Sequence, residues 1–470
     1  MYVEQFFVKG LAHSSYLLGG TDTCAIVDPQ RDIEVYLHAA EEMGMKITHI
    51  LETQLHADFI SGHLDLADAT GAVIYAPKSA KCRFRHRAVA EGDSFRIENM
   101  SIRVLETPGH TPEHISYVVT DRSRGKEPAA VFCGDTLFVG DVGRPDLFPG
   151  KARDLAHKLY DSLHGKLMAL PDFCDVYPAH GAGSLCGRAM GAKRWTTIGY
   201  ERRCNPALQI PDREQFIRSL TTDMPAAPDH FSRCSAINGK GPARVHTLPG
   251  ILLMDPARFS KAAGKKNTIV LDIRSYDAFG GQHVPGAYNI DISGNFSTFA
   301  GWVLPPDHDI LLVAGSGEEA YEAGVLLRRV GLDRVVGYLD GGMFEWSRQG
   351  LPTGHVPQVS VRELNQLMKG RSELTLVDVR AAGEYEAVHI EGAVNIPAPD
   401  LRTRHGSLKK SRPVAVICST GHRSSLSASL LKQAGFANVC NVAGGMTGYS
   451  AAGFSPECPM CVAPHVPRTS

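Results

Sequence analysis

The 470-residue sequence lacks the features that define membrane, disulfide-rich secreted and nucleic-acid-binding proteins. No apolar run approaches the ~20 residues that a membrane-spanning helix needs. The 49 basic side chains nearly cancel the 50 acidic ones, so a net charge of −1 provides no general attraction for nucleic acid or anionic lipid. The 11 cysteines are odd in number and spread along the chain, unlike a disulfide framework. Because the first residues also lack the layout of a signal peptide, we expect a cytoplasmic protein that binds neither nucleic acid nor membranes.

An internal repeat occupies the C-terminal half of the chain. Residues 270–274 read VLDIR and residues 376–380 read LVDVR, and several further positions match at the same offset. The repeat predicts two similar domains, at 255–352 and 358–455. In each of them, short β-branched strands alternate with helical stretches, which indicates an α/β fold with a parallel sheet and helices on both faces.

The N-terminal region, residues 1–240, carries potential metal ligands just after its strand-like runs, and residues 230–250 are predicted to form a linker. These ligands are His56, Asp58, His110, Asp135 and His180. Side chains at the carboxyl ends of neighbouring strands converge in space, so we expect them to share one site. Two imidazoles and one carboxylate with open positions are typical of a non-heme Fe(II) site that binds O2, with tetrahedral zinc as the alternative.

The stretches QLHADF, TPGHT, GDTLF and PAH resemble the metallo-β-lactamase fold, an αββα sandwich. GDVGRPDLF (140–148) and ERRCNP (201–206) resemble the persulfide dioxygenase branch of that family. The resemblance implies one Fe(II) ion per chain, held by two His and one Asp, and the oxidation of glutathione persulfide to sulfite. It also favours Arg144 as a residue that binds a substrate carboxylate, although its spacing equally allows a structural ion pair.

The first ligand loop departs from the family pattern at two positions. Phe59 stands where two-metal hydrolases have a ligand of the second metal, which argues against such a hydrolase. Gln54 stands where the dioxygenases have an iron-binding His. The resemblance therefore implies His56, His110 and Asp135 as the ligands, with the amide oxygen of Gln54 as the alternative to His56. A domain that has lost its metal and acts as a scaffold remains open.

The second repeat contains a six-residue loop, from Cys418 to Arg423, between an apolar strand and a helix. A loop wrapped around a cysteine at a helix N-terminus points backbone N–H groups at the sulfur and stabilises a thiolate or persulfide. VDVR, HIEGAVNIP and AGGM make this repeat similar to a single-domain rhodanese, a sulfurtransferase. The resemblance implies Cys418 and Arg423 as catalytic residues, with Gly421 and His422 in substrate binding.

The first repeat lacks this active loop. The segment aligned with Cys418–Arg423 is AGSGEE, in which Ala314 has no thiol and Glu318 and Glu319 would repel an anionic donor. We therefore expect a degenerate rhodanese-like domain that packs or docks. The remaining segment, 456–470, is predicted to be a tail whose Cys-x-x-Cys pair is only a weak zinc signal.

Together these patterns predict a three-domain sulfur-metabolism enzyme that uses a small thiol persulfide, thiosulfate and O2. Two alternatives are a zinc-dependent thioester hydrolase resembling glyoxalase II, and a sulfur-carrier protein whose N-terminal domain is inactive. The sequence leaves open whether the thiol is glutathione, coenzyme A or bacillithiol, and whether the chain forms a homo-oligomer.

Overall fold

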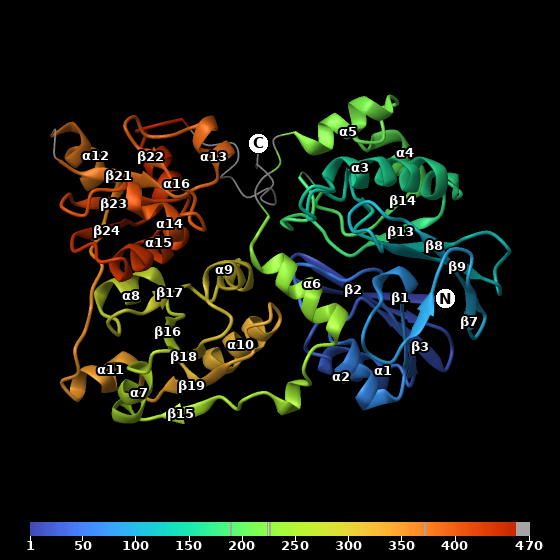
Figure 1. Ribbon diagram of the computed structural model, residues 1–470, viewed down its shortest axis with the longest axis horizontal. Helices are drawn as coiled ribbons and strands as arrows, with labels where there is room; N and C mark the ends of the chain where they lie inside the picture. The colour runs from blue at the N-terminus through green and yellow to red at the C-terminus, as the bar shows by residue number, and fades with distance from the viewer. Residues whose placement is uncertain (189, 223, 225–226, 371–372, 457–470) are drawn as a thin grey trace. The chain divides into compact units, whose positions relative to one another are not determined.

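The computed structural model describes residues 1–188, 190–222, 224, 227–370 and 373–456. The chain divides into two compact units (Figure 1). The first comprises Met1–Leu248 with Arg328–Gly331, and the second comprises the rest of the chain from Pro249. Cys458 and Cys461, in the predicted tail, lie outside the described residues. None of the helices in the described ranges has both the length and the apolar character needed to cross a membrane.

Two six-stranded sheets form the centre of the first unit. The first sheet contains, in spatial order, β1 (Tyr2–Val8), β2 (His13–Gly19), β3 (Thr23–Val27), β4 (Lys46–Leu51), β5 (Val73–Pro77) and β6 (Arg87–Val89). The second contains β14 (Thr196–Thr197), β13 (Asp175–Pro178), β10 (Ala130–Gly134), β9 (Ile115–Asp121), β8 (Met100–Glu106) and β7 (Ser94–Ile97). A separate hairpin joins β11 (Leu137–Phe138) and β12 (Asp141–Val142). Strands β3 to β6 pair in parallel, as do β10 and β13.

Helices cover the outer faces of the two sheets. They are α1 (Glu34–Glu42) and α2 (His63–Thr70) on the first sheet, and α3 (Ala152–Asp161), α4 (Ile198–Cys204) and α5 (Arg213–Thr221) on the second (Figure 1). Short helical turns η1 (Lys78–Ala80), η2 (Ser162–Lys166), η3 (Leu167–Ala169) and η4 (Val245–Thr247) complete the unit. The αββα sandwich implied by the resemblance is confirmed.

Strand β10 illustrates why this sequence forms a central layer. All five of its residues are buried, because successive side chains point to opposite faces and both faces are covered. Ala130 and Phe132 face the other sheet, whereas Val131 and Cys133 face the helices. The strand therefore ends deep inside the unit, and the residue that follows it, Asp135, is buried as well.

The expectation of a linker over residues 230–250 is wrong in its first part. Helix α6 (His230–Lys240) forms there, because Phe231, Cys234 and Asn238 recur at helical spacing and are all buried. The Asn238 amide donates 2.8 Å hydrogen bonds to the carbonyl oxygens of His56 and Phe59. This helix is therefore part of the first unit and holds the loop that carries the predicted ligands.

The second unit contains both repeats apart from Arg328–Gly331, and each repeat has a five-stranded sheet of parallel strand pairs in the same spatial order. The first sheet has β15 (Leu252–Met254), β19 (Val335–Leu339), β18 (Asp309–Val313), β16 (Thr268–Asp272) and β17 (Tyr288–Asn289). The second has β20 (Gln358–Val359), β24 (Val439–Val442), β23 (Val414–Ile417), β21 (Thr375–Asp378) and β22 (Val394–Asn395). The prediction of parallel α/β domains is confirmed.

Helices alternate with the strands along the chain in both repeats. The first repeat has α7 (Pro256–Ala263), α8 (Tyr276–Gly281), α9 (Phe296–Val303), α10 (Gly317–Arg328) and α11 (Gly342–Arg348). The second has α12 (Val361–Lys369), α13 (Ala382–Ala387), α14 (Leu401–Arg404), the turn η5 (His405–Ser407), α15 (His422–Gln433) and α16 (Gly445–Ala451). The helix expected after the Cys418 loop corresponds to α15, which ends at Gln433.

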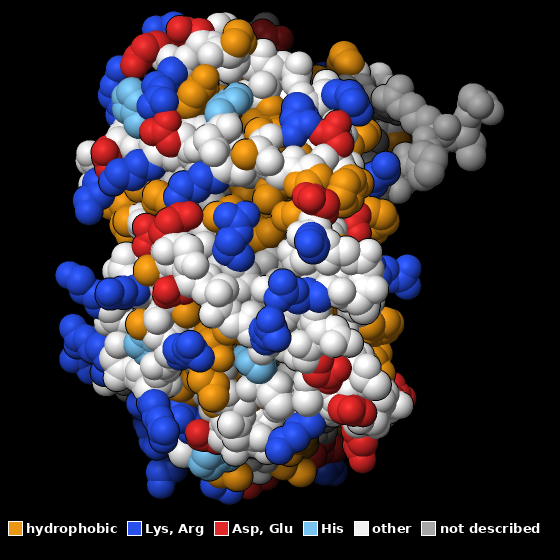
Figure 2. All heavy atoms as spheres, turned by 90° about the vertical axis from the view of Figure 1, so that its right-hand side faces the viewer, with side chains coloured by type: hydrophobic (Ala, Val, Ile, Leu, Met, Phe, Trp, Pro, Cys, Tyr) orange, Lys and Arg blue, Asp and Glu red, His pale blue; other side chains and the backbone are white. Residues whose placement is uncertain are grey.

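Basic and acidic side chains are mixed on the face of the molecule drawn in Figure 2. Figure 2 shows one face on which Lys and Arg side chains stand among Asp and Glu side chains and apolar areas. This distribution agrees with the near-zero net charge of the whole chain.

The same buried ion pair is found in both repeats. Arg380 donates to the Asp378 carboxylate at 2.6 Å and to the Val388 carbonyl, and its side chain is fully buried. Arg274 binds Asp272 in the same way, but its side chain is 15% exposed. Replacing one partner of a buried ion pair leaves the other charge buried, with neither a partner nor water to stabilise it.

We therefore expect Asp378→Asn to lower the free energy of unfolding by about 3–5 kcal/mol, because Arg380 would remain buried and unpaired. The matched variant Asp272→Asn is expected to cost less, since water reaches Arg274. Denaturant titration of both variants measures this difference. Equal losses in the two variants would contradict the role assigned to burial.

Candidate functional site

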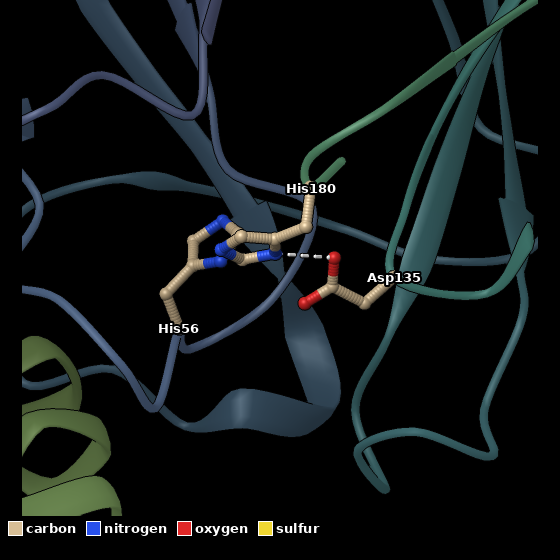
Figure 3. A group of neighbouring side chains, drawn as sticks. All are labelled: His56, Asp135 and His180. Atoms are coloured by element: carbon tan, nitrogen blue, oxygen red, sulfur yellow. Dashed lines mark hydrogen bonds and ion pairs between the residues drawn. The ribbon is translucent and has the colours of Figure 1, made fainter. Parts of the chain in front are cut away.

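Six polar side chains converge inside the first unit. They come from the loops after β4, β8, β10 and β13 and are Gln54, His56, Asp58, His110, Asp135 and His180. All six are buried, and Figure 3 shows His56 and His180 beside Asp135. Because β10 and β13 run in parallel, their carboxyl ends bring Asp135 and His180 to the same edge of the sheet.

Asp135 lies at the centre of this group. The Gln54 amide nitrogen donates to its Oδ2 atom at 2.7 Å, and His180 Nδ1 lies 2.7 Å from its Oδ1 atom. His110 Nε2 lies 3.4 Å from Oδ2. Burial alone would raise the pKa of Asp135, but the charge of His180 and the hydrogen bond from it outweigh burial and lower that pKa. Asp135 is therefore an ionised carboxylate.

His180 is held between two carboxylates. Its Nε2 atom lies 2.7 Å from Asp58 Oδ2, and its Nδ1 atom faces Asp135. Burial alone would lower the pKa of His180, but the charges of Asp135 and Asp58 raise it well above the usual value. Each of its two nitrogens therefore faces a carboxylate oxygen.

His110 has the opposite arrangement. Its Nδ1 atom forms a 2.8 Å hydrogen bond with the Arg144 carbonyl oxygen, which can only accept, so Nδ1 carries the proton. Burial lowers the pKa of this imidazole, despite the opposing charge of Asp135. The lone pair of Nε2 is thus directed toward the Asp135 side, the arrangement found in metal-binding histidines whose other nitrogen is fixed by a carbonyl group.

His56 reaches the site from the first ligand loop. Its Nε2 atom lies 3.1 Å from Asp28 Oδ1, and its Nδ1 atom lies 3.3 Å from the Gln54 amide nitrogen. Asp28 is itself fixed by the backbone N–H and the hydroxyl of Thr53, each at 2.8 Å. The ring of Phe59 packs against His56 with 4.5 Å between centroids. Phe59 therefore supplies an apolar wall where a further ligand would otherwise stand.

The residues fit a metal ion. Three groups among the described residues bring ligand atoms within 4.8 Å of one another: His56–Asp135–His180, Asp58–His180–Cys186 and His110–Asp135–Cys186. Gln54 Oε1 and Asp58 Oδ1 are buried without a hydrogen-bond partner among the described residues. Such orphaned oxygens are expected where a cation belongs. Of the three ligands predicted from the sequence, His56 and Asp135 fall in one group, and His110 joins Asp135 in another.

Sequence reasoning missed several residues of this site. Asp28, which orients His56, directly follows β3, lies 28 residues before His56 in the sequence and belongs to no recognisable motif. Cys186 lies six residues after His180, and its only signal is that proximity. His13 opens β2, and both of its nitrogens lack hydrogen-bond partners among the described residues. Its ring centroid lies 3.9 Å from that of Phe59.

Arg144 is held by its own loop and by the loop that contains Leu185. Its guanidinium donates two 2.7 Å hydrogen bonds to Asp146 and a third, at 3.2 Å, to the Leu185 carbonyl. The side chain is only 3% exposed. These contacts favour the structural ion pair that the spacing left open, with the backbone carbonyl of Arg144 fixing His110.

The Cys418 loop of the second repeat forms a cradle for sulfur between β23 and α15. Cys418 Sγ accepts hydrogen bonds from the Gly421 backbone N–H at 3.1 Å and from the Ser424 hydroxyl at 3.3 Å. Gly421 has a φ of +110°, a conformation that side-chain-bearing residues rarely adopt. Glycine at this position therefore allows its N–H to point at the sulfur.

Arg423 is paired with a carboxylate that the sequence analysis did not identify. Its two terminal nitrogens donate to the oxygens of Glu384 at 2.6 and 2.8 Å, and it also contacts the Ser419 hydroxyl. Burial would raise the pKa of Glu384, but the hydrogen bonds and charge of Arg423 lower it to about 2. The cation is thus balanced, and Arg423 stabilises the loop.

In the first repeat, the Glu319 side chain occupies the corresponding loop. Glu319 Oε2 accepts a 2.8 Å hydrogen bond from the Gly315 backbone N–H. Ala314 is buried at the position that aligns with Cys418. An internal carboxylate therefore binds an N–H group of this loop.

Comparisons with known proteins identify the families of both parts of the chain. The Metallo-beta-lactamase superfamily matches residues 8–180, and the Rhodanese-like domain matches residues 255–349 and 360–452. A metallo-beta-lactamase from Staphylococcus aureus superimposes with a TM-score of 0.66 and 35% identity, covering 72% of this chain and 99% of that chain.

Two kinds of relatives match the first unit. The mitochondrial persulfide dioxygenase of Mus musculus is 30% identical over 228 residues, which are 46% of this chain and 80% of that protein. The hydroxyacylglutathione hydrolase of Rhodospirillum rubrum is 41% identical over 162 residues, or 34% of this chain. The chain spans 58% of the length of that hydrolase.

His110 and His180 differ in their hydrogen bonds, and this difference predicts different effects of replacing each one. We expect His110→Ala to abolish stoichiometric metal binding, because His110 Nε2 directs its lone pair at Asp135. His180→Ala should weaken binding by ~10–100-fold, the usual effect of losing a residue that orients a ligand. Metal titration of the purified variants measures both, with the exposed His38→Ala as control. Full metal binding by His110→Ala would contradict the assignment.

Gln54 provides a second test at the same site. Gln54→His should tighten metal binding, because an imidazole is a better ligand for a divalent transition metal than an amide oxygen. Gln54→Ala should weaken it moderately through the loss of the hydrogen bond to Asp135. Competition with a chelator of known affinity measures the metal affinities of the unaltered protein and the two variants. An unchanged affinity in Gln54→His would show that this position does not face the metal.

Proposed function

The chain belongs to the metallo-β-lactamase superfamily and continues into two rhodanese-like domains, and from this we propose that it is a persulfide dioxygenase joined to a sulfurtransferase. In this proposal Cys418 carries sulfane sulfur to or from a small thiol, and the first unit oxidises the resulting persulfide with O2 to sulfite. The observation that carries the proposal is the pair of hydrogen bonds from Gly421 and Ser424 to Cys418 Sγ.

Sulfur transfer at Cys418 follows from that geometry. The thiolate would attack the outer sulfur of thiosulfate, and cleavage of the sulfur–sulfur bond would release sulfite and leave a persulfide on Cys418. A thiol acceptor then takes the outer sulfur and regenerates the cysteine. The Gly421 N–H and the Ser424 hydroxyl stabilise negative charge on sulfur throughout. The Arg423–Glu384 pair holds the loop in place.

For the first unit, His56, His110 and Asp135 are proposed as the iron ligands. Ferrous iron, when bound, supplies the one-electron chemistry that O2 needs to react with a persulfide. The Arg144 carbonyl keeps the Nδ1 proton on His110, and Asp28 orients His56. The overall reaction, in which a persulfide, O2 and water give a thiol, hydrogen sulfite and a proton, balances in atoms and charge.

A metal-dependent thioester hydrolase is the second candidate, because the similarity to the hydroxyacylglutathione hydrolase of Rhodospirillum rubrum is higher in identity. Phe59 argues against a two-metal hydrolase, because its apolar ring packs against His56 at the position where a second metal would need a ligand. The cysteine loop of the second repeat also has no role in hydrolysis. The dioxygenase is therefore favoured.

Incubation of the full chain with thiosulfate is expected to add one sulfur atom to Cys418, visible by mass spectrometry of the corresponding peptide. Cys418→Ser should abolish sulfur transfer to cyanide or to a thiol, and leave intact any O2 uptake with preformed persulfide. Cys440→Ser, a partly buried cysteine of the same repeat, is the matched control. Normal transfer by Cys418→Ser would contradict the proposal.

A further inference from the structure

The first repeat contacts the helix that carries the Cys418 loop. The Ser425 hydroxyl, in the first turns of α15, donates a 2.5 Å hydrogen bond to the Asn289 amide oxygen of the first repeat. Further along, the Ser429 hydroxyl accepts from the Asn289 backbone N–H at 3.2 Å. Apolar residues of both repeats also belong to one buried cluster. The N-terminus of α15 is thus fixed by residues from outside its own repeat.

Tyr276, the first residue of α8 in the first repeat, lies against the Cys418 loop. A Cβ atom on Gly421 would lie only 3.0 and 3.1 Å from two carbons of the Tyr276 ring. The same ring lies 5.4 Å from the His422 ring, measured between centroids. Because Gly421 donates its N–H to Cys418 Sγ, the Tyr276 ring covers the residue that holds the sulfur.

Asp291 of the first repeat follows β17 and reaches the same place. Its Oδ2 atom lies 3.6 Å from His422 Nε2, and its side chain is 14% exposed, whereas that of His422 is 48% exposed. The other charged side chains of the loop entrance, Arg423 and Glu384, form a pair and cancel each other. A carboxylate from the first repeat therefore adds a negative charge beside the entrance.

We propose that the first repeat, although it has no cysteine, completes the entrance to Cys418: Tyr276 forms one wall, and Asp291 selects against sulfur donors and acceptors with two negative charges. A singly charged persulfide is therefore favoured over a dianion such as thiosulfate, which still reacts with Cys418 but more slowly. This inference rests on the proposed sulfur transfer at Cys418. Tyr276 and Asp291 act as positioning and selectivity residues, because they touch the loop and not the sulfur.

Alkylation of Cys418 tests the inference without requiring sulfur transfer. The rates with neutral iodoacetamide and anionic iodoacetate are measured on the full chain by mass spectrometry of the Cys418 peptide. Asp291→Asn is expected to raise the iodoacetate rate about threefold and to leave the iodoacetamide rate unchanged, since one unit charge across a wet entrance has about that effect. Tyr276→Ala should raise both rates by opening the wall, and Tyr276→Phe should raise neither.

Asp307→Asn is the matched control. Asp307 is an exposed carboxylate of the same repeat that precedes β18, so it lies at the opposite edge of the parallel sheet from Asp291. An unchanged ratio of the two rates in Asp291→Asn, or the same change in Asp307→Asn, would overturn the inference. If Tyr276→Ala fails to fold, the alkylation rates of Asp291→Asn and Tyr276→Phe still test the inference. If Cys418 accepts no sulfur yet shows these rates, the proposed function fails and the entrance geometry stands.

Discussion

The buried charge of Asp135 is the constraint on which the first unit depends. Removing an ionised carboxylate from water costs several kcal/mol unless hydrogen bonds and opposite charges replace the water. Here His180 and Gln54 supply them, and the Asp135 backbone N–H donates to His114 at 2.9 Å. The loops that follow β4, β10 and β13 must meet for this to happen. The interactions that hold the sandwich together therefore also bring together the ligands for a metal.

The second unit contains the same sheet order twice, and the two repeats differ in the loop that holds Cys418 in the second. In both repeats an Asp–Arg pair and an Asn side chain join the ends of two neighbouring strands, as Asp378 and Asn395 do in the second. What differs is the group that the loop N–H atoms bind. In one loop it is the sulfur of Cys418, and in the other it is the carboxylate of Glu319. The first repeat thus has the same fold but no nucleophilic cysteine, and its residues Tyr276 and Asn289 pack against the Cys418 loop and α15 of the second repeat.

Local patterns in the sequence were enough to predict the repeats, the parallel sheets, the Cys418 loop and the histidines and carboxylates that converge on Asp135. The residues that were missed act over long distances along the chain. Glu384 precedes its partner Arg423 by 39 residues, and Asn238 binds backbone atoms about 180 residues away. No periodicity or motif links such positions, so α6 was taken for part of a linker. Tyr276 escaped notice for the same reason, since its target Gly421 belongs to the other repeat.

The central claim is that a metal at Asp135 and the sulfur at Cys418 belong to one reaction sequence. Its most direct test is O2 uptake by the full chain loaded with Fe(II), supplied with glutathione persulfide, alongside measurement of sulfite. The account predicts one O2 consumed and one sulfite formed per persulfide, with no uptake in Asp135→Ala. Stoichiometric iron binding without O2 uptake, or thioester hydrolysis in its place, would contradict it.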